Sequence, residues 1–242
     1  MVEKMLHKNP LLVEEADPKS GELPLHKIVE RASPWTLLID MILTLYPKAV
    51  VHKDLDGLLP IHHAAKADNI TALDIIYESY KNGAKDVDAL GRLPIHVAAI
   101  HGSIEAIKYL TMKAPDGAST VVFPGSDAGG SLPLHLACKH YSSVGVITSL
   151  MRSPLHFSLA GFTDENGELP LHLLLRGGAA VDVSAMKTVL TCHLNAISTR
   201  DQAGDVSINH PVQLFRLHPA LTHVIMLSCV YLKRADSVAH CA

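Results

Sequence analysis

The stretch that decides the fold runs from Asp88 to Ser103 and reads DALGRLPIHVAAIHGS. Its centre is a glycine, then a leucine–proline pair, an aliphatic residue and a histidine, and this pattern occurs five times. The copies are GELPLH from Gly21, GLLPIH from Gly57, GRLPIH from Gly91, GSLPLH from Gly130 and GELPLH from Gly167. Successive copies are 34 to 39 residues apart, a period typical of stacked-repeat proteins. A weaker sixth copy, GDVSIN, begins at Gly204.

Each copy combines the residues of a turn with those of a helix start. In every copy but the first, an aspartate precedes the glycine by three residues, whereas Asp17 lies four residues before Gly21. An aspartate can bond the backbone two residues on, and glycine can take a positive φ, so both favour a turn. The proline three residues after the glycine suits the first position of a helix. We therefore expect a turn followed by a helix in each unit.

A second apolar segment follows each of these helices. The five segments are TLLIDMILTLY (36–46), ITALDIIYESY (70–80), SIEAIKYLTM (103–112), VGVITSLM (144–151) and VSAMKTVLTCHL (183–194). Helices this short are marginally stable alone in water, so their apolar faces must pack against neighbouring units. This predicts an all-α solenoid of helix-turn-helix repeats with connecting β-turn loops.

We divide the chain into repeat units that together form one solenoid domain. The predicted units are a partial N-terminal repeat (1–16), repeat 1 (17–53), repeat 2 (54–87), repeat 3 (88–126), repeat 4 (127–163), repeat 5 (164–200) and a degenerate C-terminal repeat or cap (201–242).

The repeated pattern D-x-x-G-x-L-P-[LI]-H-x-[AI] resembles the ankyrin repeat, D-x-x-G-x-T-P-L-H-x-A followed by two antiparallel helices. The segments 82–91 (NGAKDVDALG) and 96–110 (HVAAIHGSIEAIKYL) are also similar to ankyrin sequences. The resemblance covers about residues 17 to 200, and it implies that the repeated histidines bond backbone groups of adjoining turns. One departure is that leucine replaces the family's threonine at residues 23, 59, 93, 132 and 169. Without that hydroxyl, we expect aliphatic packing to hold the turn.

Composition narrows the classes of partner and compartment. The formal net charge is −3, so the basic excess typical of nucleic-acid binding is missing. The longest apolar stretch, Ala220–Leu232, is too short to insert into a membrane; it is either the core of a last helix or an interface with another chain. The four cysteines form no C-x-x-C pair, which favours a reducing compartment. We expect an intracellular protein, in the cytoplasm with the nucleus left open, and a monomer.

The sixteen histidines raise the question of a metal site. Stacked helices lie about 8–10 Å apart, so successive repeat histidines cannot share a zinc ion, whose ligands lie about 2 Å from it. The one compact cluster is His135, Cys138 and His140, but Cys138 occupies a place that is alanine in other copies, which favours a small buried thiol. No phosphate-binding or nucleophile motif lies in a suitable context. We expect no catalytic, cofactor-binding or metal-binding residues.

The leading hypothesis is a non-catalytic protein–protein interaction module or scaffold. The alternative is a regulatory or substrate-recruiting fragment of a larger enzyme, channel or ligase complex, and a metal-dependent enzyme built on His135 ranks third. The resemblance implies that partners bind the turn tips and the exposed face of the first helices. The candidate contacts are Leu55, Asp56, Leu58, His63, Lys66, Ala89, Leu90, Arg92, His101, Ser131, Lys139, His140, Glu165, Asn166, Glu168 and Arg176.

Overall fold

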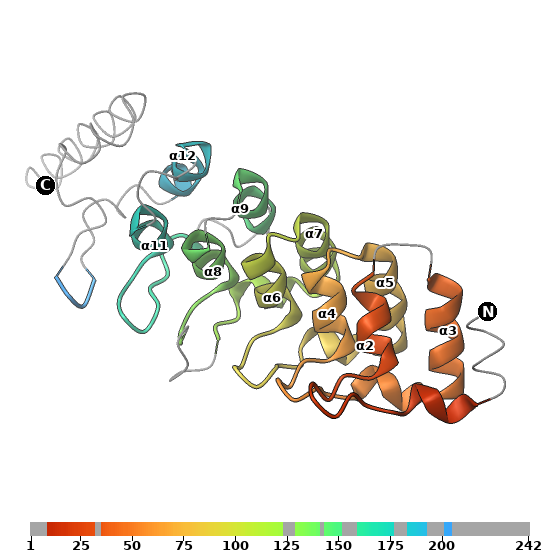
Figure 1. Cartoon of the computed structure of the whole chain (residues 1–242). Helices are drawn as coiled ribbons and strands as arrows, with labels where there is room; N and C mark the ends of the chain where they lie inside the picture. The colour runs from red at the N-terminus through yellow and green to blue at the C-terminus, as the bar shows by residue number, and fades with distance from the viewer. Residues whose placement is uncertain are drawn as a thin grey trace, which may run out of the picture. The chain divides into compact units, whose positions relative to one another are not determined.

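The computed structural model describes residues 9–31, 35–122, 129–140, 143–151, 159–176, 183–192 and 201–204. The chain divides into two compact units, Met1–Pro133 and Leu134–Ala242, and each is presented by itself. Within the described ranges the regular structure is helical (Figure 1), which confirms the predicted all-α class. The repeat boundaries and the single solenoid domain stay predictions.

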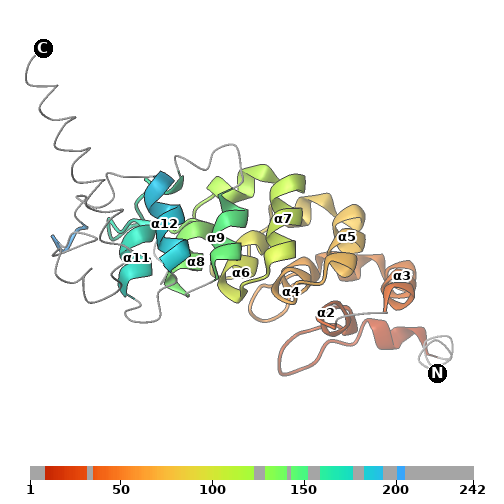
Figure 2. The same cartoon turned by 90° about the horizontal axis from the view of Figure 1, so that it is seen from above.

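In its described residues, the first unit contains three pairs of helices. The first helix of each pair is called inner here: α2 (Pro24–Val29), α4 (Pro60–Lys66) and α6 (Pro94–His101). The second is called outer: α3 (Thr36–Leu45), α5 (Ile70–Ser79) and α7 (Ile104–Lys113). Figures 1 and 2 show the inner helices in one row and the outer helices in a second row beside it. The sequence analysis missed the 3₁₀ helices of the described residues, which are η1 (Pro10–Val13) before α2, and η2 (Pro47–Val51), η3 (Lys81–Ala84) and η4 (Pro115–Ser119) after the three outer helices.

Each inner helix begins at the proline of the motif, as predicted. In α4, Pro60 is the first helical residue and Leu59 is the N-cap, with an extended backbone. The Leu59 side chain is 1% exposed, so aliphatic packing takes the place of the missing threonine hydroxyl. Ala64 and Ala65 are fully buried, and their small side chains let α4 approach its neighbours closely.

The turns before the inner helices are joined to one another. The Leu55 N–H donates to the Ser20 carbonyl, and the Ala89 N–H donates to the Asp56 carbonyl, each at 3.0 Å. Within a turn, the Asp54 carboxylate accepts the N–H groups of Asp56 and Leu58. The predicted aspartate–glycine turn is therefore confirmed, and it is also bonded to the turn that precedes it.

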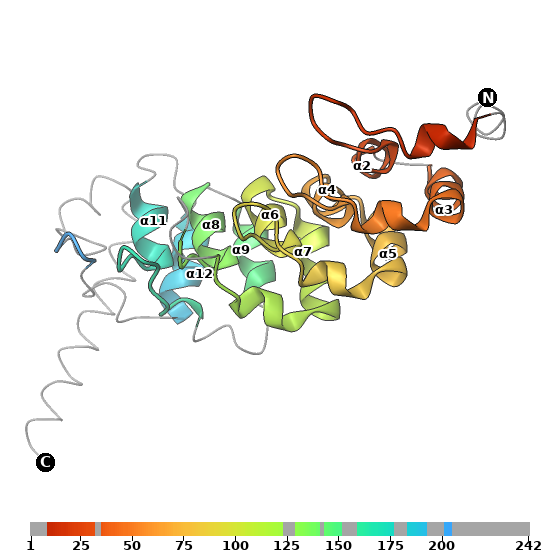
Figure 3. The same cartoon turned by 90° about the horizontal axis from the view of Figure 1, so that it is seen from below.

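The second unit repeats the same local structure. Its helices are α8 (Pro133–Lys139, starting at the last residue of the first unit), α9 (Val144–Leu150), α11 (Pro170–Arg176) and α12 (Val183–Cys192). Figure 3 shows α11 and α12 from below, and both α9 and α11 pack against α12. The sixth copy forms the predicted turn, in which the Gly204 N–H donates to the Asp201 carbonyl at 3.0 Å. The apolar stretch 220–232 lies outside the described residues. No helix in the described ranges is long and apolar enough to cross a membrane.

Candidate interaction surface

The histidine of the motif ties each inner helix to its own start and to the following connection. In the third copy, His96 Nδ1 accepts the Leu93 N–H at 3.1 Å, and Nε2 lies 2.9 Å from the Thr120 carbonyl. Because Nδ1 accepts, the proton must be on Nε2, which donates to that carbonyl. His62 has the same arrangement, with Nδ1 on the Leu59 N–H and Nε2 at 3.2 Å from the Arg92 carbonyl.

Burial keeps these rings neutral. Desolvation lowers the pKa of His62, His96 and His135 to about 4, and all three side chains are fully buried. A neutral ring bonded at both nitrogens to backbone groups has no nitrogen left for a metal. The structural role that the resemblance implied for the repeat histidine is confirmed at His62 and His96, whereas in the fifth copy the His172 Nδ1 accepts the Leu169 N–H but its Nε2 is buried without a partner.

The turn tips of repeats 2 and 3 expose apolar side chains. Leu55 is 70% exposed and Leu90 is 53% exposed, and Ala89 beside it is also exposed. Their backbone is fixed, since the Asp88 carboxylate accepts the N–H groups of Leu90 and Arg92 at 2.9 and 2.8 Å. At these tips, apolar side chains are exposed to solvent on a backbone that hydrogen bonds hold in place.

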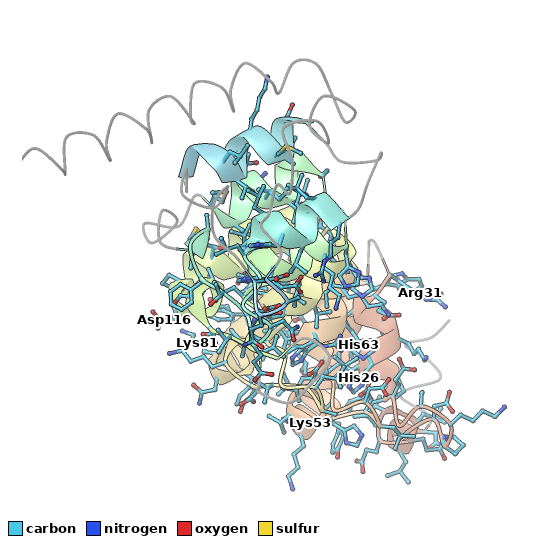
Figure 4. All side chains as sticks on the ribbon, turned by 90° about the vertical axis from the view of Figure 1, so that its left-hand side faces the viewer. His26, Arg31, Lys53, His63, Lys81 and Asp116 are labelled. Carbon is cyan, nitrogen blue, oxygen red and sulfur yellow. The ribbon has the colours of Figure 1, made fainter. Side chains whose placement is uncertain are left out.

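Beside the tips lies a compact ionic cluster, centred on His63 of α4. His63 Nε2 is 2.8 Å from an Asp54 carboxylate oxygen, and Nδ1 is 2.9 Å from Glu30. An ionised carboxylate accepts but cannot donate, so both bonds form together only when the ring carries a proton on each nitrogen. Figure 4 labels His63 and His26, whose rings meet edge to face at 5.1 Å.

Two lysines and a third acid complete the cluster. Lys66 pairs with Glu30 at 3.2 Å, and Lys27 pairs with Glu22. The bond from Lys27 lowers the pKa of Glu22 despite partial burial. Burial would raise the pKa of Glu30, but the bonds from His63 and Lys66 outweigh it and lower the pKa. These bonds join residues of repeat 1 to residues of repeat 2.

Glu22, Asp54 and His63 are also the one group of described residues whose ligand atoms lie close enough to hold a metal ion, all within 4.8 Å of one another. The His63 nitrogens face carboxylates of different elements, Glu30 at the end of α2 and Asp54 in a turn. A bound cation would have to replace one of these hydrogen bonds. The geometry therefore matches an ion-pair network better than a preformed metal centre.

The second unit carries a smaller ionic group at equivalent positions. The Arg176 guanidinium lies 2.6 Å from Glu168 and 3.4 Å from Asp201. Burial raises the pKa of Glu168, and the charge of Arg176 opposes that effect. The tip residues Glu165 and Asn166 are joined to the next turn, because Gln202 donates to both of their carbonyls.

The sixteen predicted contact residues divide by exposure. Eleven are exposed: Leu55, Asp56, Lys66, Ala89, Leu90, His101, Lys139, His140, Glu165, Asn166 and Arg176. Leu58 and Arg92 are half-buried. For the remaining three, His63, Ser131 and Glu168, the expectation of an exposed side chain is wrong, since all are at most 5% exposed. His63 lies between carboxylates, and Glu168 lies against Arg176. Ser131 lies in a buried segment, and its carbonyl accepts the Val122 N–H at 2.9 Å.

The third-ranked hypothesis, a metal enzyme built on His135, Cys138 and His140, is not supported by the geometry. These three do not form a group of converging ligand atoms in the described residues. His135 Nε2 bonds the Glu168 carbonyl at 3.1 Å, and burial raises the pKa of the Cys138 thiol to about 12. Cys138 is the small buried residue that the repeat pattern indicated.

The sequence analysis missed the acids that surround His63. Glu30 and Lys66 occupy the same place, four residues after the motif histidine, in successive repeats. Opposite charges at one repeat position indicate an ion pair across the repeat interface, and that signal was available in the sequence. Asp54 was assigned only to its turn, although its second carboxylate oxygen also bonds His63.

Stacked helix pairs joined by bonded turns define a repeat protein, and its candidate contact residues lie on the turn tips and the inner helices. A family model of ankyrin repeats, in three copies, matches residues 2–122, which is half of the chain. The chain therefore belongs to the ankyrin-repeat family, whose repeats are generally non-catalytic protein–protein interaction modules. Among curated proteins, none matches the sequence.

Proposed function

We propose that this chain is a non-catalytic scaffold that binds a partner protein through the turn tips of its first unit. The observation that supports the proposal is the exposure of Leu55 and Leu90 on turns whose backbone is already bonded in place. Monomeric proteins expose single apolar residues often, but here two large ones and Ala89 lie on successive, hydrogen-bonded turns.

The rigidity of the turns favours binding. Fully burying a leucine side chain contributes about 1.5–3 kcal/mol. Most of that gain is usable, because the Asp54 and Asp88 carboxylates already hold the tip backbone and little ordering entropy is lost on association. A flexible loop with the same residues would bind more weakly.

The surroundings of the tips suit an interface rim. Arg92 pairs with Asp88 at 2.7 Å, and Lys66 and His101 are exposed on the inner helices. Interfaces commonly place apolar anchors at the centre and polar groups at the rim. We infer a partner that offers apolar side chains to Leu55 and Leu90 and polar groups to this rim. The four cysteines of the sequence form no C-x-x-C pair, which favours a reducing compartment and therefore a partner inside the cell.

Site-specific photo-crosslinking in cells tests the proposal. A photoreactive phenylalanine analogue is placed at Leu55 or at Leu90, and a matched control carries it at Lys108, which is exposed on the outer helix α7. We expect one crosslinked protein shared by the two tip positions and missing at Lys108. Crosslinks of equal yield at all three positions, or none at the tips, would refute a tip-centred site.

A binding measurement with the crosslinked partner follows. Leu90→Asp should weaken the affinity at least about tenfold, as is common for a central apolar anchor, while Lys108→Asp should leave it unchanged. Equal affinity for both variants would place the contact elsewhere.

A further inference from the structure

The motif aspartates of repeats 2 and 3 bond the same kind of group with one carboxylate oxygen and different groups with the other. In both turns, Oδ1 accepts two backbone N–H groups of the same turn. Oδ2 of Asp54 lies 2.8 Å from Nε2 of His63, whereas Oδ2 of Asp88 accepts from the guanidinium of Arg92 at 2.7 Å. Arginine keeps its charge at any ordinary pH, but histidine changes its charge near neutrality. Repeat 2 therefore has a titratable cation where repeat 3 has a permanent one.

The second nitrogen of His63 faces the preceding repeat. Nδ1 lies 2.9 Å from Glu30 and 3.8 Å from Glu22, and the side chain is 3% exposed. In repeat 3 the cation comes from the same turn as its aspartate, and Val97 occupies the place of His63. A buried titratable ring therefore lies in the junction between repeats 1 and 2, and its counterpart in the next repeat is apolar.

The proton between Nδ1 and Glu30 belongs to the ring. Burial raises the pKa of Glu30, but the bonds from His63 and Lys66 outweigh it, so the pKa is lowered and the carboxylate is ionised at neutral pH. The His26 ring, whose centroid is 5.1 Å away, bonds backbone groups at both nitrogens, and burial together with the charge of His63 lowers its pKa to about 4. The charged and titratable groups around these two rings are Glu22, His26, Lys27, Glu30, His52, Asp54, His62, His63 and Lys66.

We propose that the junction between repeats 1 and 2 is pH-dependent and that His63 controls it. With a proton on each nitrogen, the ring bonds Asp54 of its own repeat and Glu30 of the preceding one. When the ring loses one proton, the Asp54 side chain keeps the remaining N–H, since it is 4% exposed and that of Glu30 is 31% exposed. The lone pair of Nδ1 then faces the carboxylates of Glu30 and Glu22, which repel it. The junction is tight while the ring is charged and loosens as the pH rises.

Two backbone hydrogen bonds of equal length report on the two junctions separately. The Leu55 N–H donates to the Ser20 carbonyl across the junction of repeats 1 and 2, at 3.0 Å. The Ala89 N–H donates to the Asp56 carbonyl across the junction of repeats 2 and 3, also at 3.0 Å. A pH-dependent first junction should change the protection of the Leu55 amide against hydrogen exchange and leave that of Ala89 unchanged.

Hydrogen exchange of the full chain from about pH 6 to about pH 9.5 covers the range in which a charged histidine loses its proton. Each rate is corrected for the intrinsic exchange rate at that pH, and the protection factor of Leu55 is divided by that of Ala89. We expect this ratio to fall about tenfold as the ring loses its proton, as is typical when one charge-assisted hydrogen bond is lost.

Nitrogen NMR of histidine-labelled full chain follows the charge of each ring in the same samples, because a doubly protonated imidazole has different nitrogen shifts from a neutral one. At about pH 7, His63 should have two protonated nitrogens. His62 and His96 should have one each, since burial lowers their pKa to about 4. His63→Gln assigns the His63 signals by their loss.

Glu30→Gln removes the charge of the acid and keeps its hydrogen-bonding capacity. The amide oxygen accepts from a charged ring, and the amide N–H donates to a neutral one. The protection ratio should therefore no longer depend on pH. Glu105→Gln is the matched control, because it removes an exposed acid that pairs with Lys108 on α7, and it should keep the wild-type pH profile.

A double substitution transfers the arrangement of repeat 3 to repeat 2. Residues 58 and 63 correspond to Arg92 and Val97, so Leu58→Arg combined with His63→Val gives Asp54 a permanent cation. The protection ratio should then be constant over the pH range. Circular dichroism of each variant checks that the helices are intact.

Several results would overturn the proposal. One is a His63 ring that is neutral at about pH 7 in the folded wild type, and another is a ring that keeps both protons to the end of the range. A third is a ring that loses its proton while the protection ratio stays constant, or while Ala89 loses protection in parallel with Leu55. A fourth is a wild-type pH profile in Glu30→Gln.

Discussion

Replacing Gly57 with alanine tests how closely successive turns pack. Gly57 has a φ of +76°, and a Cβ added there would lie 2.5 Å from the backbone nitrogen of Ala89 in the next turn. Gly102 is a matched control, because its φ is +75° but an added Cβ would meet nothing within 4 Å. The two substitutions share the backbone strain and differ in the steric contact.

The expected magnitudes follow from that difference. A side chain in the left-handed region costs about 1–2 kcal/mol, and replacing glycine returns about 0.4–1 kcal/mol by restricting the unfolded chain. Gly102→Ala should therefore cost about 1 kcal/mol. Gly57→Ala must also displace the next turn, and overpacking of this kind costs a further 1–3 kcal/mol or so. We expect a total of about 2–4 kcal/mol.

Urea unfolding of the full chain, followed by circular dichroism, measures both free energies of unfolding. Hydrogen exchange locates the effect: the Ala89 amide, which donates to Asp56 at 3.0 Å in the native protein, should exchange faster in Gly57→Ala and unchanged in Gly102→Ala. Equal destabilisation by the two substitutions, or unchanged protection of Ala89 in Gly57→Ala, would refute the close packing of the turns.

Three further predictions concern titratable groups. Burial lowers the pKa of His96 from 6.5 to about 4, so the stability that its neutral ring contributes is complete above pH 6.5 and is lost as the pH falls toward 4. When the pH falls from about 7 to about 5.5, the free energy of unfolding in urea should decrease by about 1 kcal/mol less for His96→Gln than for the wild type, and an equal decrease would contradict this. His63→Ala leaves the Asp54 carboxylate buried without its partner and should cost about 3 kcal/mol, whereas Lys66→Ala removes an exposed pair and should cost at most about 1 kcal/mol; similar costs would argue against a cluster centred on the histidine. The Cys138 thiol, whose pKa burial raises to about 12, should resist a thiol reagent in the native protein and react in urea, and rapid native labelling would show that the site opens.

Most of the local structure was predictable from the sequence. The prolines that start the inner helices, the aspartates and glycines of the turns and the apolar period of the outer helices all act within a few residues of themselves. The role of His96 was also predictable, through the resemblance, because its bond to the Leu93 N–H lies within one turn of helix. The 3₁₀ helices were missed because η1, which precedes α2, and η2, η3 and η4, which follow the outer helices, lie at points that carry no strong signal beyond a proline at residues 10, 47 and 115.

The sequence by itself determined the repeat, its helix pairs and its buried histidines, because those depend on chemistry between residues close together in the chain. Only the tertiary structure decided which side chains near the turn tips are exposed. His63 follows the motif histidine as Lys27 does in the preceding copy, yet His63 is buried and Lys27 is exposed. The difference arises because Glu30, from the preceding repeat, and Asp54 converge on His63.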